Sequence, residues 1–172
     1  MCSANHDAAI SRRGVAALFA GAAAITLLPL RARAAGPVEA LGLTCIDFRL
    51  VDDAVRFFAQ LGLANDYDEV ALAGASLAAV SPKFPSANSA FWDQLAIAKD
   101  LHHIKKVVVL DHRDCGAYKV AFGKDYAGEP AAETAQHKTV MMSLQTAMAQ
   151  MHPDLTSEFY LMALDGTAER IL

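Results

Sequence analysis

Cysteine, tryptophan and long apolar runs are all scarce in this chain. Its 172 residues include three cysteines and one tryptophan, so at most one disulfide can form within it. The most apolar stretch, residues 15–30, is shorter than the roughly 18 apolar residues that a membrane-spanning helix needs. The chain is nevertheless 54% hydrophobic, which is enough for one domain with a buried core. We therefore expect one globular domain and no stable membrane insertion.

The first 34 residues predict a targeting signal. Arg12 and Arg13 stand just ahead of the apolar stretch, and residues 32–34 (Ala-Arg-Ala) supply small side chains at the spacing that a signal peptidase reads. The twin arginines resemble the signal for export of folded proteins. We therefore expect a periplasmic or otherwise exported protein whose mature domain spans residues 35–172. An uncleaved membrane anchor is the alternative, which the shortness of the apolar stretch disfavours.

An excess of positive charge is also missing. The whole chain has 15 basic and 19 acidic residues. Removal of the expected signal takes away four arginines and one aspartate, which leaves 11 basic and 18 acidic residues and a net charge of −7. Such a surface argues against nucleic acid and anionic membranes as partners. We therefore expect no nucleic-acid partner.

The order of the predicted elements indicates an α/β domain. A continuous β-branched run at 105–110 predicts a central strand covered on both faces, and the pattern at 131–151 predicts a long helix. Strands that alternate with helices predict a mostly parallel central sheet flanked by helices. The other expected strands are 41–46, 69–73, 159–164 and 168–171, the other helices are 50–61, 89–102 and 118–122, and 76–88 is expected to be loop-like with a short helical turn at its start.

Two short segments combine residue types that bind metal ions. Residues 45–49 (Cys-Ile-Asp-Phe-Arg) follow the first expected strand, and residues 112–116 (His-Arg-Asp-Cys-Gly) follow the central one. If these strands are neighbours, Cys45, His112 and Cys115 converge at the sheet edge where ligands bind in open α/β folds. Two thiolates and one imidazole are good zinc ligands, and a fourth position left open is typical of a catalytic site.

Asp47 and Arg49 are the candidate catalytic residues beside this site. A zinc ion lowers the pKa of its bound water from about 16 toward neutrality and so provides a hydroxide nucleophile. Asp47 and Arg49 lie two apart, so on an extended segment they point to the same side as Cys45. An ionised Asp47 held by Arg49 could orient the zinc-bound water. Alternatively, Asp47 could become the fourth zinc ligand and close the site.

The spacing Cys-x-Asp-x-Arg with a distant His-x-x-Cys-Gly resembles the signature of the β-class carbonic anhydrases. This resemblance implies that Cys45, His112 and Cys115 bind zinc and that Asp47 and Arg49 gate it. It also implies reversible hydration of carbon dioxide to bicarbonate, a β-carbonic-anhydrase-like fold, and a homodimer or a multiple of dimers. The chain departs from the family at residues 71–74, where Ala-Leu-Ala-Gly replaces the common Arg-Asn-Ala-Gly.

Several alternatives stay open at this point. The same site could hydrolyse another small electrophile, such as carbonyl sulfide or carbon disulfide, or the protein could be a non-catalytic exported zinc-binding protein. A Cys45–Cys115 disulfide in a binding module is a further alternative. We expect His137 and His152 on the solvated side of the long helix and Asp114 in an exposed loop or capping position, without a functional role.

Overall fold

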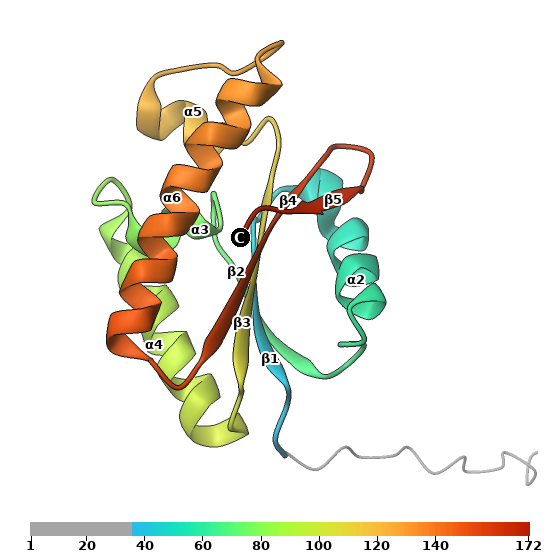
Figure 1. Cartoon of the computed structure of the whole chain (residues 1–172), viewed down its shortest axis with the longest axis vertical. Coiled ribbons are helices and arrows are strands. Elements are labelled where there is room, and N and C mark those ends of the chain that lie inside the picture. Colours follow the sequence, from blue (N-terminus) through green and yellow to red (C-terminus); the bar gives the residue numbers. More distant parts are fainter. Residues whose placement is uncertain (1–35) are drawn as a thin grey trace, which may run out of the picture. The chain divides into compact units, whose positions relative to one another are not determined.

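The computed structural model describes residues 36–172, which form a five-stranded sheet with helices on both faces (Figure 1). The expected signal, residues 1–34, lies outside the described residues, so export stays a prediction. The strand order is β2-β1-β3-β4-β5, where the first four are parallel and β5 runs antiparallel to β4. The strands are β1 Ala40–Thr44, β2 Tyr67–Ala71, β3 Lys106–His112, β4 Thr156–Met162 and β5 Ala168–Arg170. The predicted α/β fold with a mostly parallel sheet is confirmed.

The helices lie in two layers, one on each face of the sheet (Figure 1). Helix α2 covers one face, and α3, α4 and α6 cover the other. Their bounds are η1 Phe48–Leu50, α2 Val51–Gln60, α3 Ser76–Val80, α4 Pro85–His102, α5 Gly116–Phe122 and α6 Pro130–Met151. Within residues 36–172, none of these helices combines the length and apolarity that a bilayer crossing requires.

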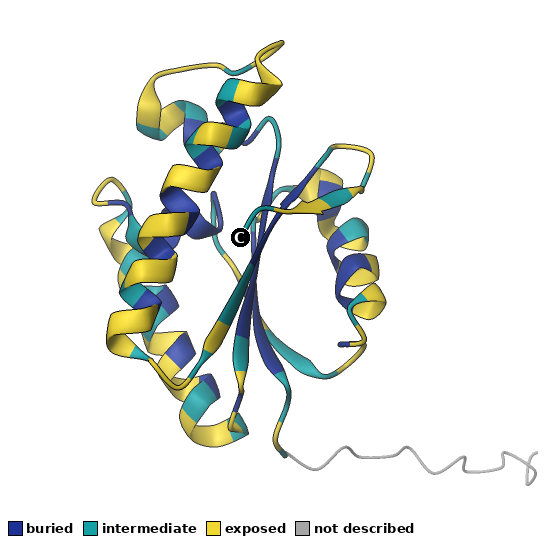
Figure 2. Ribbon diagram, viewed as in Figure 1, coloured by how far each residue is buried: buried dark blue, intermediate teal, exposed yellow. Residues whose placement is uncertain are grey.

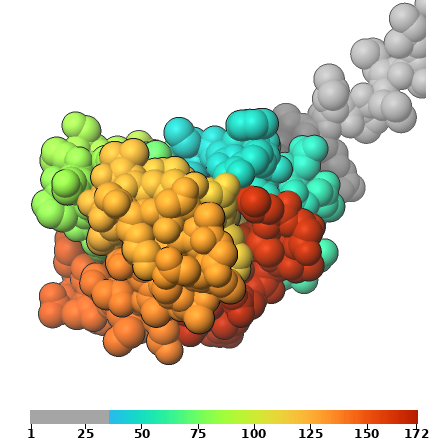
Figure 3. Space-filling model, turned by 90° about the horizontal axis from the view of Figure 1, so that it is seen from above, coloured from blue at the N-terminus to red at the C-terminus, as the bar shows by residue number. Residues whose placement is uncertain are grey.

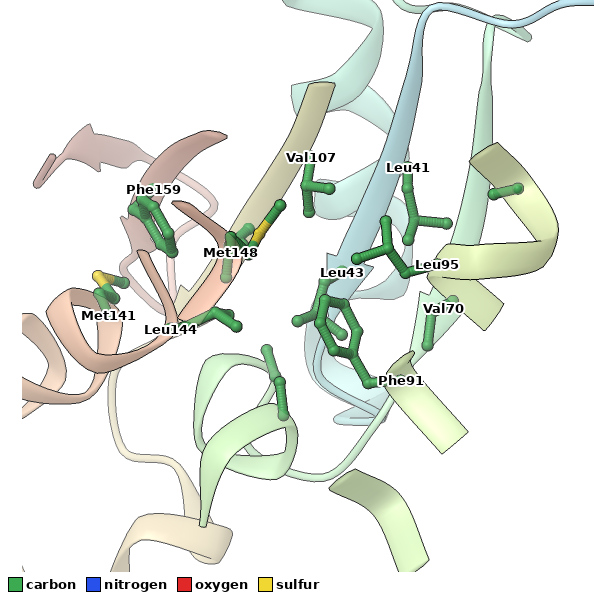
Figure 4. Packing of buried hydrophobic residues seen from close by; sticks show 14 of the residues in the cluster. Leu41, Leu43, Val70, Phe91, Leu95, Val107, Met141, Leu144, Met148 and Phe159 are labelled. Carbon is green, nitrogen blue, oxygen red and sulfur yellow. The ribbon is translucent and has the colours of Figure 1, made fainter. Parts of the chain in front are cut away.

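The central strand β3 is buried on both sides, as its sequence predicts (Figure 2). Val107 and Val109 belong to the larger core under α4 and α6, whereas Val108 and Leu110 belong to the smaller core under α2. This division follows from the alternation of side chains along a strand. Figure 4 shows the larger core, which also includes Leu41, Leu43, Val70, Phe91, Leu95, Met141, Leu144, Met148 and Phe159.

Helix α6 buries one stripe against the sheet, and this stripe includes two polar residues. Met141, Leu144 and Met148 are at most 1% exposed, while Met142 and Met151 face outward. The stripe continues toward the helix N-terminus through His137, which is 1% exposed, and Glu133. The prediction that His137 is solvated is therefore wrong, because His137 lies one helical turn before Met141 on the same buried face. His152 is also partly buried and stacks on Trp92.

The segment between β2 and β3 is more helical than its sequence suggests. The expected loop 76–88 contains the five-residue helix α3 and the first turn of α4. Helix α4 begins at Pro85, four residues earlier than predicted, since proline has no amide hydrogen to lose and fits the first helical position. The short turn expected at the start of the loop is thus a buried helix that packs on α4 and α6.

Gly42 in the middle of β1 allows the close approach of α2. A Cβ atom at this position would lie 2.7 Å from Cζ of Phe58. The Phe58 ring is fully buried, stacks on Tyr67 with centroids 4.3 Å apart and meets Phe57 edge-on, so it has no free space to move into. The glycine is therefore required by the packing of α2 and not by its own backbone angles.

We predict that Gly42→Ala destabilises the domain by about 1–3 kcal/mol, because the added methyl group overpacks a rigid aromatic cluster. Chemical denaturation followed by circular dichroism measures the change. Gly116→Ala is the matched control, because no atom lies within 4 Å of its added Cβ. Equal stability of the Gly42→Ala variant and the unmodified protein would contradict this account of the packing.

Candidate metal centre

The three predicted metal ligands converge at the carboxyl ends of two neighbouring strands. Cys45 directly follows β1 and His112 ends β3, and these strands pair in parallel through register pairs such as Thr44 with Leu110. Cys115 follows three residues later, at the N-cap of α5. One ligand atom from each residue lies within 4.8 Å of the other two. The convergence predicted from the two strand positions is confirmed. Figure 3 looks onto this edge, where the segment between β3 and α6 covers the middle of the face.

The two cysteines are free thiols and do not form the alternative disulfide. Their Sγ atoms lie 4.0 Å apart, whereas a disulfide requires about 2.05 Å. Two sulfurs bound to a tetrahedral zinc at about 2.3 Å each would be separated by about 3.8 Å. The observed spacing therefore fits two thiolates that share one metal ion.

His112 presents its second ring nitrogen to the same point. Its Nδ1 atom lies 2.8 Å from the carbonyl oxygen of Arg113, so Nδ1 carries the hydrogen and donates it. Nε2 then holds a lone pair. This atom is buried and finds no hydrogen-bond partner among the described residues. Buried polar atoms normally have a partner, and a metal ion would supply one to this nitrogen. The imidazole and the two thiols therefore form a residue set that fits a zinc ion.

The surroundings of Cys45 favour its thiolate. The pKa of Cys45 is lowered well below its usual value, mainly because the Cys115 thiol donates a hydrogen bond to its sulfur. Burial opposes this shift, while His112 and the backbone amide of Gly74, 3.3 Å from Sγ, support it. The same contact raises the pKa of Cys115, so Cys45 loses its proton first. Gly74 has a φ of +88°, and a Cβ there would press on Ala117.

Asp47 and Arg49 form the predicted pair, although by a different local structure. Residues 48–50 are not extended but form the turn η1, and Asp47 is its N-cap. Oδ1 of Asp47 accepts from the backbone N and Nε of Arg49 at 3.0 and 2.9 Å, and Oδ2 accepts from Nη2 at 2.7 Å. These bonds hold the pKa of Asp47 at about 2. Oδ2 also lies 3.8 Å from Nε2 of His112.

Asp114 links the two motif segments, 45–49 and 112–116, through hydrogen bonds with Arg49. This role was not predicted from the sequence. Nη1 of Arg49 donates to its carboxylate at 2.9 Å, and Nη2 donates to its carbonyl at 3.2 Å. Lys119 forms an ion pair with the same carboxylate at 2.7 Å. Asp114 has a left-handed φ of 56°, which turns the chain from β3 into α5. It is therefore not a free loop residue, since it anchors the guanidinium that holds Asp47.

The ligand loop is also fixed to α6 through the buried Glu133. One carboxylate oxygen accepts from the backbone amide of Asp114 at 2.6 Å, and the other accepts from Arg113 at 3.1 Å. Glu133 is 7% exposed, so these bonds compensate for its loss of hydration. The sequence contains a weak signal for this role. Glu133 and His137 lie at helical spacing before the buried apolar residues of α6, so they fall on its buried face.

A second carboxylate, Asp111, is completely buried behind the ligands. It accepts hydrogen bonds from Ser76, Tyr118 and His137, which come from α3, α5 and α6. Burial raises the pKa of Tyr118 well above its usual value, so its hydroxyl keeps the proton that it donates. The sequence does contain a signal for this cluster, because Asp111 is an acidic residue that directly continues the buried apolar run 107–110.

A cavity of about 410 Å³ opens on the α2 side of the sheet, and two of the three ligands, Cys45 and His112, line it. Its wall is mainly apolar, and Asp47 and Glu69 supply its carboxylates. Residue 71, where the chain departs from the family pattern described above, also lines this cavity. It is alanine here, so this position of the wall carries no charge. The lining is completed by Thr44, Cys45, Ile46, Leu50, Val51, Ala54, Leu110, His112 and Met162.

Comparisons with known proteins agree with this geometry. A family model described as "Putative carbonic anhydrase" matches residues 38–156. The chain is 38% identical over 129 residues to an uncharacterized protein of Rickettsia conorii, which covers 75% of this chain and 69% of that protein. An uncharacterized protein of Rickettsia bellii shows the same identity over 75% of this chain and 79% of its own length.

Two solved structures share the fold at low sequence identity. The carbonic anhydrase of Streptococcus mutans has a TM-score of 0.57 and 18% identity, over 95% of this chain and all of that one. The β-carbonic anhydrase isoform I of Trichomonas vaginalis has a TM-score of 0.56 and 13% identity, over 95% of this chain and 98% of its own. By its family model and its fold, the chain belongs to the carbonic anhydrase family and has the β-class architecture.

Proposed function

We propose that the protein is a zinc-dependent carbonic anhydrase that interconverts carbon dioxide and bicarbonate. The observation that carries this proposal is the set of Cys45, His112 and Cys115, whose ligand atoms lie within 4.8 Å of one another in a member of this family. These residues would hold the ion through two sulfurs and Nε2 of His112. When bound, zinc supplies a Lewis acid that makes water a nucleophile near neutral pH.

Asp47 and Arg49 would orient the reacting water. Both carboxylate oxygens of Asp47 are held by Arg49, which is itself held by Asp114. An ionised, fixed carboxylate is an acceptor for a water proton and cannot rotate freely. Among the described residues, the close ligand group contains three members and not Asp47, which supports an open fourth position.

The apolar cavity supports a small uncharged substrate. Carbon dioxide has no net charge or dipole, so a wall formed by side chains such as Leu50, Val51 and Met162 can accept it without hydrogen bonds. Asp47 and His112 line the same cavity, which brings a substrate held there to the reacting groups. Carbonyl sulfide and carbon disulfide are linear and weakly polar as well, so assays with these two molecules test the alternative substrates.

We predict one zinc ion per chain in the purified protein, and loss of most of it in Cys45→Ser and His112→Ala variants. Each substitution removes one of three protein ligands from the ion. Elemental analysis measures the zinc, and stopped-flow assays with a pH indicator measure hydration of carbon dioxide. Removal of zinc by a chelator should abolish the activity and added zinc should restore it. A fully zinc-loaded protein that shows no hydration activity at any pH would contradict the proposal.

We predict that Arg49→Ala lowers kcat/KM for hydration by about 100-fold while zinc stays bound, because Asp47 loses the partner that orients it. Arg56→Ala is the matched control. Arg56 also pairs with a nearby aspartate, Asp53, but it does so on the exposed surface of α2. The control should retain full activity. Unchanged kcat/KM in Arg49→Ala would remove the dyad from the mechanism.

We also propose that two copies of the chain associate, as the family resemblance implies. Three apolar side chains near the metal centre are more than half exposed and support this proposal: Ile46, Phe48 and Val51. Phe48 is 86% exposed, and its association with a second copy would remove it from water. Sedimentation equilibrium should give a dimer mass for the unmodified protein and a weaker dimer for Phe48→Asp. A monomer at all concentrations would refute the association.

A further inference from the structure

We propose that Asp111 is a positioning residue that holds all three metal ligands in place through one buried carboxylate. This inference rests on the proposed metal centre, because the ligands matter only if they bind an ion. Asp111 does not contact that centre through its own side chain. Its carboxylate points into the protein on the side of α3, α5 and α6, and it acts through the segments that carry the ligands.

The carboxylate of Asp111 receives four hydrogen bonds from three helices. Oδ1 accepts from the backbone amide of Ser76 at 2.9 Å. Oδ2 accepts from Ser76 Oγ at 2.6 Å, from the hydroxyl of Tyr118 at 2.7 Å and from Nδ1 of His137 at 2.8 Å. Asp111, Ser76, Tyr118 and His137 are all at most 1% exposed. A buried carboxylate with this many donors is fixed in position, since any rotation would leave donors unpaired.

The link to His112 is direct. Asp111 immediately precedes this ligand in β3, and both residues pair in register with β4, opposite Leu161 and Met162. The strand therefore holds the backbone of His112, while the helices hold the side chain of Asp111 next to it. Together they fix the backbone from which the imidazole extends toward the two sulfurs.

The link to Cys115 runs through α5. Cys115 is the N-cap of this helix and Tyr118 lies one turn further on, on its buried face. The helix has only seven residues, so it has little intrinsic stability of its own. Hence the hydrogen bond from the Tyr118 hydroxyl to Asp111 ties the start of α5, and with it Cys115, to the end of β3.

The link to Cys45 runs through the segment between β2 and α3. The amide of Gly74 donates to Cys45 Sγ at 3.3 Å. Ser76, two residues later, donates to Asp111 through both its amide and its hydroxyl. Asp111 thus fixes the backbone that places the Gly74 amide against the sulfur. Each of the three ligands is reached from this one carboxylate by a different route.

Tyr118→Phe is the sharpest test, because it removes one hydroxyl and keeps the buried ring. We predict that it weakens zinc binding by about 10–100-fold, the size typical of groups that orient metal ligands. Competition with a chromophoric chelator measures the affinity. Substitution of cobalt for zinc adds a second readout, because the visible absorption bands of cobalt report the geometry of its ligands. We expect shifted bands in the variant at full cobalt occupancy.

Tyr160→Phe is the matched control. Its hydroxyl also donates a hydrogen bond from a buried tyrosine, to Glu158 at 2.8 Å, but on β4 and away from the ligand segments. This variant should keep the zinc affinity and the cobalt spectrum of the unmodified protein. Ser76→Ala provides a second test that also keeps the local packing. It should weaken zinc binding in the same direction, by a smaller factor, because the Ser76 amide still donates to Asp111.

The outcomes separate the positioning role from the metal centre itself. Weaker zinc binding and shifted cobalt bands in Tyr118→Phe, with an unchanged Tyr160→Phe, would support the role of Asp111. Unmodified affinity and spectra in both Tyr118→Phe and Ser76→Ala would overturn it and leave the metal centre standing. Equal losses in Tyr118→Phe and Tyr160→Phe would also overturn it, since general destabilisation would then explain both. An unmodified protein that binds neither metal would refute the proposed function first.

Discussion

The parallel pairing of β1 with β3 is the constraint on which the site depends. It places the ends of two strands, more than 60 residues apart in sequence, side by side at one edge of the sheet. Cys45 and His112 are therefore neighbours before any side-chain contact is made, and the turn into α5 adds Cys115. The hydrophobic layers on both faces keep this pairing in place, because every residue of β1 is buried. The core thus stabilises the geometry that the metal ligands need.

Much of this arrangement follows from the sequence, and the reasons are physical. The run 107–110 has to be a buried strand, and ligands that follow strands have to meet at the carboxyl edge of a parallel sheet. The roles that escaped sequence reasoning belong to polar residues inside the protein. Three of them are of residue types that usually lie on the surface: Asp111, Glu133 and His137. Only the three-dimensional packing brings them the hydrogen-bond donors and acceptors that compensate for their burial. Asp114 escaped because its partner, Arg49, is 65 residues away.

The site and the cluster behind it differ in chemistry. On the α2 side, Cys45 and His112 face a mainly apolar cavity with Asp47 in its wall. On the other side, Asp111 and its donors form a closed polar cluster with no exposed member. The first arrangement leaves room for a substrate, and the second leaves no room for movement. A reaction centre needs both properties, because the substrate must enter while the ligands stay fixed.

The capping role of Asp47 has a consequence for the movement of its side chain. One carboxylate oxygen of Asp47 accepts from both the backbone amide and the side chain of Arg49, so the residue caps the start of η1 as well as forming the ion pair. A swing of Asp47 onto the metal ligands would break the cap and the ion pair at once. Such a swing would leave the backbone amide and the guanidinium of Arg49 without their acceptor. Closure of the site would therefore require the simultaneous loss of three hydrogen bonds, so it is an opposed movement and not a free rotation of one side chain.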